Sequence, residues 1–224
     1  MKIRPVLNSP ILYNAVKNGQ GYRVRALLQI SPYLIVNDRL RVLPIAAEYN
    51  DLEIVKLLVE GGININECNK EGVTALCIAA KHSYNGLVDY LLDHNANPNI
   101  GNKCGLTPLY YYAVAGNVDM VRNLLENKAL VDPVGGHMIK STPLCQATNR
   151  SVAEVLVEYG ADINWKDSFY LSTPLHYAAS EGKKDVAEFL LECGANQTVD
   201  WLKATPYDLA IAFGYGEIAD ILTA

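Results

Sequence analysis

Four side chains that could ligate a metal or act as nucleophiles recur at one position of a repeated pattern: Cys77, Tyr110, Cys145 and His176. Each stands three residues after a threonine, and those threonines are separated by 33, 35 and 31 residues. Zinc needs all its ligands at about 2.0–2.3 Å, whereas equivalent positions on neighbouring packed helices are about 8–10 Å apart. The spacing therefore argues against one shared metal ion and favours a buried, structural role for all four side chains.

The remaining histidines, His82, His94 and His137, fall at different phases of the pattern, with no serine or cysteine placed beside them for activation. No glycine pair is followed by the Lys-Ser/Thr of a phosphate-binding loop. We therefore predict no enzyme, no catalytic residue, no cofactor and no metal. Because the members of a catalytic triad need only be close in space, an enzyme built on the repeat surface stays as an alternative.

The elements that position these residues follow from one phrase, Thr-Pro-Leu, which begins at residues 107, 142 and 173 and is echoed at 74 and 205. Threonine can cap a helix and proline suits the first helical position, so each phrase predicts a helix start. A second apolar-periodic run follows, as at residues 120–125, and ends in a turn such as that at residues 160–164. The repeat is predicted to be helix, turn, helix and hairpin-like finger. The first helices are expected to end at Gly19, Asn50, Gly116, Gly182 and Gly214.

The combination of Gly-x-Thr-Pro-Leu-x-x-x-Ala with Gly-Ala-Asp-Ile-Asn resembles the ankyrin repeat family over nearly the whole chain, and residues 158–164 and 173–179 stand in the expected phase. The resemblance implies an all-α solenoid of about seven helix-turn-helix repeats with hairpin-like fingers. It also implies that His176 ties its repeat to the next through hydrogen bonds. We expect a single domain over 1–224, with atypical end repeats and repeats at about 8–37, 38–68, 69–101, 102–131, 132–166, 167–199 and 200–224.

Composition narrows the class of partner. The net charge is −5 with a pI of about 5.4, which disfavours nucleic acid. No apolar run is long enough to span a membrane, and residues 1–8 lack the apolar core of a secretory signal. Five cysteines without a framework-like spacing agree with reduced thiols. We expect a monomer in the cytoplasm, or in a host cytosol if the protein is a secreted bacterial effector.

By the same resemblance, finger tips and exposed positions of the first helices line a concave groove that binds a protein partner. Large aromatic side chains fill finger positions in the C-terminal half, where small polar turn residues would suffice. They could contact a partner or brace adjacent fingers. The projected partner-binding residues are Met138, Ile139, Arg150, Phe169, Tyr170, Glu181, Trp201 and Phe213.

The fifth repeat is shortened: Ala147 to Gly160 spans 13 residues, against 16 from Ala178 to Gly194. About one turn of helix is expected to be missing, with residues 149–151 in place of the usual helix end and glycine. The result is either a local change in curvature or a compensated deletion without functional effect. The sequence as a whole predicts a non-enzymatic protein-interaction module that sequesters or scaffolds its partner. An enzyme and a structural spacer or homo-oligomer are the alternatives.

Overall fold

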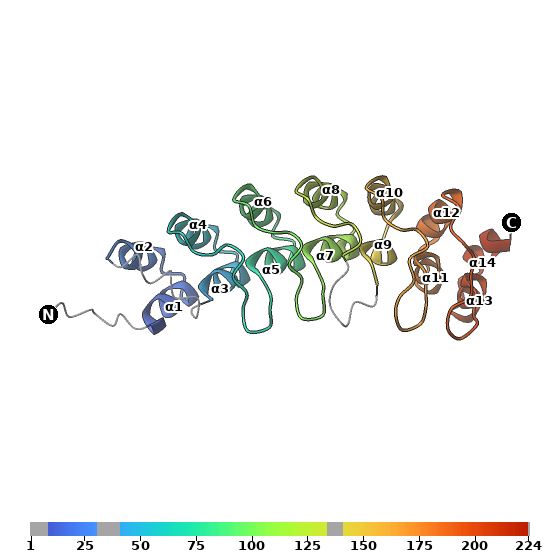
Figure 1. Ribbon diagram of the computed structural model, residues 1–224, viewed down its shortest axis with the longest axis horizontal. Helices are drawn as coiled ribbons and strands as arrows, with labels where there is room; N and C mark the ends of the chain where they lie inside the picture. Colours follow the sequence, from blue (N-terminus) through green and yellow to red (C-terminus); the bar gives the residue numbers. More distant parts are fainter. Residues whose placement is uncertain (1–8, 31–40, 134–140, 224) are drawn as a thin grey trace. The chain divides into compact units, whose positions relative to one another are not determined.

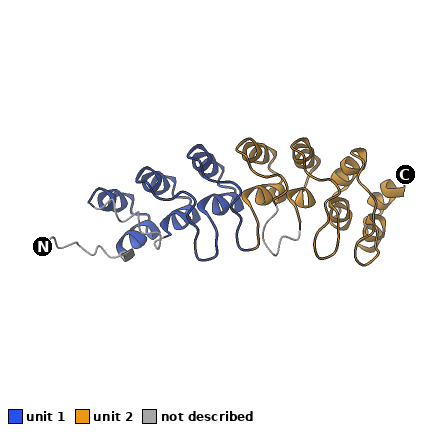
Figure 2. Ribbon diagram, in the orientation of Figure 1, with its two compact units in different colours: residues 1–103 blue, residues 104–224 orange. Residues whose placement is uncertain are grey.

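The computed structural model describes residues 9–30, 41–133 and 141–223. These ranges form fourteen α-helices and no β-strand, which confirms the all-α prediction. The helices come in seven consecutive pairs, and an isolated antiparallel bridge between Cys68 and Thr74 closes one of the hairpin-like fingers. The chain divides into two compact units, residues 1–103 and 104–224 (Figure 2). A single domain over the whole chain stays a prediction.

The N-terminal unit contains three helix pairs (Figure 1). The first helices α1, α3 and α5 pack side by side, and each also packs on the second helix of its own pair. The pairs are α1 (Ser9–Lys17) with α2 (Gly21–Ile30), α3 (Val42–Glu48) with α4 (Leu52–Glu60), and α5 (Ala75–Lys81) with α6 (Asn85–Asp93).

The C-terminal unit contains four helix pairs, in which first helices pack on first helices and second helices on second helices (Figure 1). The pairs are α7 (Pro108–Ala115) with α8 (Val118–Glu126), α9 (Pro143–Gln146) with α10 (Arg150–Glu158), α11 (Pro174–Ser180) with α12 (Lys184–Glu192), and α13 (Pro206–Ala212) with α14 (Gly216–Thr223).

Most first helices begin where the sequence pattern places them. Helices α7, α9, α11 and α13 each start at the proline that follows a threonine N-cap. The Thr74 hydroxyl accepts a hydrogen bond from the backbone N–H of Cys77 at 3.1 Å, as an N-cap does. The Thr107 hydroxyl, by contrast, is buried with no hydrogen-bond partner in the described chain. The proline, rather than a uniform threonine cap, is the shared device in the C-terminal unit.

Five of the first helices are followed by a residue in the left-handed region where predicted, at Gly19, Asn50, Gly116, Gly182 and Gly214, whereas α9 ends at Ala147 without one. The third repeat uses Ser83, with φ 56°, which the glycine and asparagine pattern missed. Beneath these turns the cores are made of leucine, valine and paired alanines such as Ala46 and Ala47, which are fully buried. Small side chains at these positions let first helices approach closely.

Candidate protein-binding site

The repeat position singled out for its chemistry is structural in this molecule. The backbone N–H of Thr173 donates to Nδ1 of His176 at 3.1 Å, and Nε2 lies 3.3 Å from the carbonyl oxygen of Ala204. Because the backbone N–H can only donate, Nδ1 is the acceptor and Nε2 carries the proton. Burial lowers the pKa of His176 and keeps it neutral. The ring thus links one repeat to the next, which confirms the role implied for it.

The two thiols at the equivalent position are also buried. Sγ of Cys77 lies 3.1 Å from the carbonyl oxygen of Ile100, and Sγ of Cys145 accepts a hydrogen bond from the Thr142 hydroxyl at 3.5 Å. Burial raises the pKa of each thiol to about 12. A catalytic cysteine needs the opposite shift, because the thiolate is the nucleophile. No group of three metal-ligating side chains lies together in the parts of the chain that the structure describes.

A second ladder runs through the turns that follow the second helices. In each case a side-chain oxygen accepts the backbone N–H of a residue one repeat later at 2.8 Å: Asn66 from Asn97, Asp132 from Asp162, and Asn164 from Asn196. Asp132 differs from the other two acceptors because it is a carboxylate, whereas Asn66 and Asn164 are neutral amides. Its second carboxylate oxygen is buried without a partner in the described chain, and burial raises its pKa.

Two finger loops of the C-terminal unit carry the predicted aromatic residues: the Asp167 loop (residues 167–173) and the Asp200 loop (residues 200–205). The buried Asp167 carboxylate holds the first loop by accepting the backbone N–H groups of Phe169 at 2.7 Å and Tyr170 at 2.6 Å. Asp200 does the same in the second loop, accepting from the N–H of Ala204 at 2.9 Å. In both loops, therefore, a buried carboxylate holds the backbone by accepting hydrogen bonds from its N–H groups.

The side chains at the tips of these loops point into solvent. Trp201 is 65% exposed and Leu202 67%, and about half of Phe169 and of Tyr170 is exposed. The loops are joined through their backbones, because the N–H of Trp201 donates to the carbonyl oxygen of Tyr170 at 2.7 Å. The structure thus holds neighbouring loops together without using the exposed faces of these rings.

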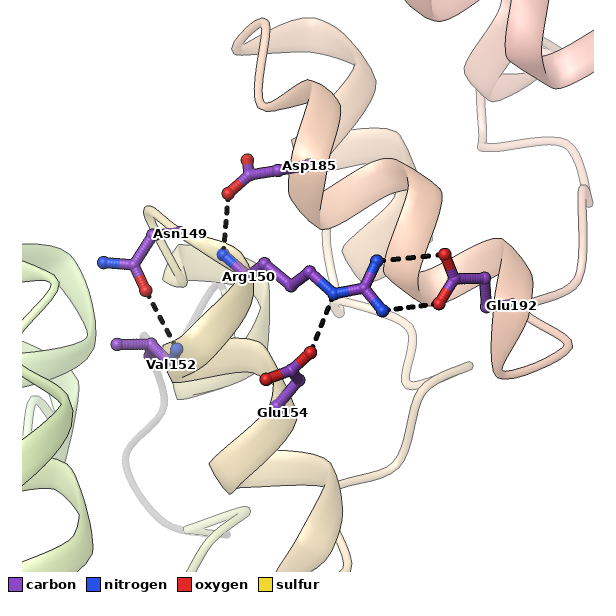
Figure 3. Close-up of polar contacts among 6 residues, drawn as sticks. All are labelled: Asn149, Arg150, Val152, Glu154, Asp185 and Glu192. Atoms are coloured by element: carbon purple, nitrogen blue, oxygen red, sulfur yellow. Dashed lines mark hydrogen bonds and ion pairs between the residues drawn. The ribbon is translucent and has the colours of Figure 1, made fainter.

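The shortened fifth repeat is confirmed, but its details differ from the prediction. Helix α9 has only 4 residues, and Ala147 leaves the helical conformation. Asn149 does not replace a helix end: it is the N-cap of α10 and accepts from the backbone N–H of Val152 at 2.9 Å (Figure 3). Its Nδ2 donates to the carbonyl oxygen of Gly116 at 3.0 Å, which gives a hydrogen-bond donor to a backbone carbonyl at the C-terminus of α7. The change in curvature stays a prediction.

The placement of Arg150 corrects the projection. A first helix of normal length would have put this residue at a groove position, whereas the structure makes it the first residue of the second helix α10. Its guanidinium binds both carboxylate oxygens of Glu192 at 2.9 and 2.6 Å and also Glu154 at 2.7 Å (Figure 3). It also lies over the Phe189 ring. The side chain is engaged in joining α10 to α12.

Arg150 belongs to a row of ion pairs that link successive second helices of the C-terminal unit. Arg122 of α8 pairs with Glu158 of α10 at 3.1 Å, and Lys184 of α12 pairs with Glu217 of α14 at 2.8 Å. The sequence analysis missed this row. The available signal was a basic residue in one second helix with a glutamate 33 to 42 positions later.

The other projected residues lie in different settings. Glu181 caps α11 at its C-terminus and forms an ion pair with Lys183 at 2.7 Å. Lys183 in turn donates to the carbonyl oxygen of Gln146 at 3.4 Å, at the end of the short helix α9. Phe213 holds the equivalent position after α13 and is 60% exposed. Met138, Ile139 and His137 lie outside the described residues.

Helix pairs, hairpin-like fingers and hydrogen bonds between successive repeats together describe a repeat protein, and a known family has the same pattern. A model of the family described as ankyrin repeats (3 copies) matches residues 12–102, 83–167 and 144–224. The chain is an ankyrin-repeat protein. Ankyrin repeats mediate protein–protein binding, so the chain belongs to a class of protein-interaction modules.

Individual ankyrin-repeat relatives support the assignment. Human cyclin-dependent kinase inhibitor 2A is 34% identical over 113 residues, which cover 50% of this chain and 72% of the inhibitor. The putative ankyrin repeat protein YahD of Escherichia coli (strain K12) is 28% identical over 190 residues, covering 80% of this chain and 93% of YahD. The crystal structure of the ankyrin repeat domain of Bcl-3 is similar with a TM-score of 0.76 at 25% identity, covering 96% of this chain and 98% of that one. No described helix is long and apolar enough to cross a membrane.

Proposed function

We propose that this ankyrin-repeat protein binds a protein partner through the Asp167 and Asp200 loops, without catalysing a reaction, and acts by sequestering or scaffolding that partner. The observation that carries the proposal is the exposure of large apolar side chains on two loops whose backbones are already fixed. Aromatic residues supply much of the binding energy at protein interfaces. Exposed clusters of them are uncommon on monomeric proteins unless they bind something.

The bracing alternative receives less support from the contacts. Carboxylates of Asp167 and Asp200, together with the backbone bond from Trp201 to Tyr170, hold the loops. Rings that braced the fingers would bury most of their surface against one another, whereas about two thirds of Trp201 is exposed. Tyr170 and Trp201 are consequently better suited to contact a partner than to support the fold.

We place the site of action in a cytosol, either the protein's own or that of a host cell. The basis is the set of five cysteines without a disulfide-like spacing, which suits a reducing compartment. Within this family, sequestration fits a surface with exposed apolar side chains, because the two cysteines at the repeated position are buried with raised pKa values and are unsuited to act as nucleophiles.

The test is affinity capture from cytosolic extract with the wild type, the Phe169→Ala/Trp201→Ala variant, and a Tyr22→Ala control. Tyr22 is an exposed aromatic residue on the second helix α2, so its loss removes a comparable ring outside the loops. We expect at least one protein to be captured by wild type and control but lost from the double variant. Circular dichroism should show unchanged helicity in all three. Equal capture by all three proteins would refute the proposal, as would a large drop in melting temperature of the double variant.

A further inference from the structure

The charges on the Asp167 and Asp200 loops and their flanks are distributed unequally between interior and surface. Lys166 and Lys203 are exposed and lie within four residues of the exposed rings in the sequence, whereas Asp167 is fully buried and Asp200 is 5% exposed. Both carboxylates accept backbone N–H groups of their own loops. Among residues 166–167 and 200–203 the formal charges cancel, but only the two lysines are exposed, because the carboxylates are buried beneath the loop backbone.

The comparable finger of the N-terminal unit, residues 69–74, differs in each of these properties. Its organising residue is the neutral Asn69, whose Oδ1 accepts the N–H groups of Glu71 at 3.0 Å and Val73 at 2.9 Å. Its tip carries Lys70 and Glu71, one charge of each sign, and no aromatic residue. The pairing of exposed lysines with exposed rings is therefore a property of the C-terminal loops and not of the finger as such.

We infer that the tips of the Asp167 and Asp200 loops bind an acidic segment of the partner protein that carries aromatic or aliphatic anchors. This inference rests on the proposed function and specifies its ligand. Apolar anchors pack against Trp201, Leu202 and Tyr170, and carboxylates of the same segment pair with Lys166 and Lys203. The lysines raise the rate of encounter with acidic sequences and disfavour basic ones, since like charges at an interface are costly.

Lysines interleaved with aromatic rings also occur where proteins bind single-stranded nucleic acid. The present site offers one lysine within the Asp200 loop and one next to the Asp167 loop, and no arginine, on a chain with a net charge of −5. Phosphate binding relies on neutralising many charges at once, so this site is poorly equipped for it. An acidic peptide needs only a few ion pairs in addition to its apolar anchors.

The experiment selects peptides from a random display library on the full chain and measures binding of the enriched peptides by fluorescence polarisation. Three variants are compared: Lys166→Glu/Lys203→Glu, Phe169→Ala/Trp201→Ala, and the charge-matched control Lys17→Glu/Lys128→Glu. Both control lysines are exposed, and neither belongs to the two loops or their flanking residues in the sequence. We expect acidic peptides with apolar anchors, bound about tenfold more weakly by the lysine variant and still more weakly by the ring variant, with the control unchanged. Affinity should fall as ionic strength rises.

The possible failures are distinguishable. Neutral or basic peptides that depend on the rings but not on the lysines would overturn the acidic ligand and leave the proposed function intact. Peptides unaffected by either loop variant, or a failure to enrich any peptide, would overturn both. Labelled oligothymidylate that binds the wild type at physiological salt and is lost from both loop variants would replace the peptide with nucleic acid. Melting curves of each variant exclude unfolding as the cause.

Discussion

Arg150 and Glu192 form a bidentate ion pair between successive second helices, in which the two terminal guanidinium nitrogens of Arg150 lie 2.9 and 2.6 Å from the two carboxylate oxygens of Glu192. The pair raises the pKa of Arg150 and lowers that of Glu192, because each charge favours the other. Both side chains keep contact with water, so screening weakens the pair. It contributes to the alignment of α10 and α12 more than an isolated surface pair would, since its geometry is bidentate.

A double-mutant cycle tests this pair. Arg150→Met and Glu192→Gln should each lower the melting midpoint slightly. Arg150→Met should have the larger effect because it also removes the contacts with Glu154 and Phe189, and the double variant should be little worse than Arg150→Met alone. Since the Glu192 pKa is depressed on folding, the stabilisation is present at neutral pH and is lost as pH falls through the carboxylate range. High salt should shrink the effect. Additive losses in the cycle would contradict a direct interaction, and Arg25→Met in α2 controls for loss of an exposed arginine.

Asp132→Asn should stabilise the protein at neutral pH by less than about 1 kcal/mol. The substitution removes a charge from a site where one carboxylate oxygen is buried without a hydrogen-bond partner, and the partial exposure of the group limits the gain. The Asp132 pKa is raised on folding, so its cost is fully present above the folded pKa and disappears as pH falls toward 3.8. The gain from the substitution should disappear over the same range. Chemical denaturation at several pH values measures it.

The reciprocal change supplies the control for Asp132. Asn164 occupies the same place in the ladder of the following repeat and accepts the N–H of Asn196 at 2.8 Å. Asn164→Asp should therefore destabilise the protein at neutral pH and recover as pH is lowered. Stability that is indifferent to both substitutions would show that the site is well solvated in solution.

Gly116→Ala should cost more stability than Gly214→Ala, although both glycines have positive φ. An alanine at either position incurs about 1 kcal/mol for the left-handed conformation. At position 116 the added Cβ would also lie 2.7 Å from Nδ2 of Asn149 and from Oγ1 of Thr148, whereas nothing lies within 4 Å at position 214. We expect a further loss of about 1–3 kcal/mol for Gly116→Ala. Urea denaturation of the two variants gives the difference, and equal losses would contradict the close packing of the short repeat.

Four of the five thiols should fall into two classes of reactivity toward Ellman's reagent. Cys104 and Cys193 are exposed and should react rapidly in the native protein. Cys77 and Cys145 are buried with pKa values of about 12 and should react only after unfolding. Peptide mapping of the labelled thiols identifies which have reacted. Rapid native labelling of Cys145 would show that the short helix α9 opens readily.

The sequence predicts the helix starts of the C-terminal unit well because their cause is local. Proline after a capping residue specifies the first turn regardless of what packs against it, as at Pro143 and Pro174. The exposure of Trp201 and Phe169 follows from the same phase, because finger tips have no neighbour above them. Their binding role stays a prediction.

The projection was wrong for Arg150 because it assumed that every first helix has the same length. Where α9 stops depends on Asn149, which caps α10 and simultaneously satisfies the end of α7. That arrangement depends on a contact across 33 residues, which no local pattern encodes. The pairing of Arg150 with Glu192 and the burial of one carboxylate oxygen of Asp132 are likewise consequences of stacking between repeats.

The backbone bond from Trp201 to Tyr170 has a consequence for how such a protein changes over evolution. Main-chain atoms and two buried carboxylates hold the loops through hydrogen bonds in which the rings of Tyr170 and Trp201 take no part. Substitutions of these two rings should therefore change the surface that the loops present with little loss of folding stability. Under the proposed function, such substitutions would change the partner one side chain at a time while the scaffold is retained.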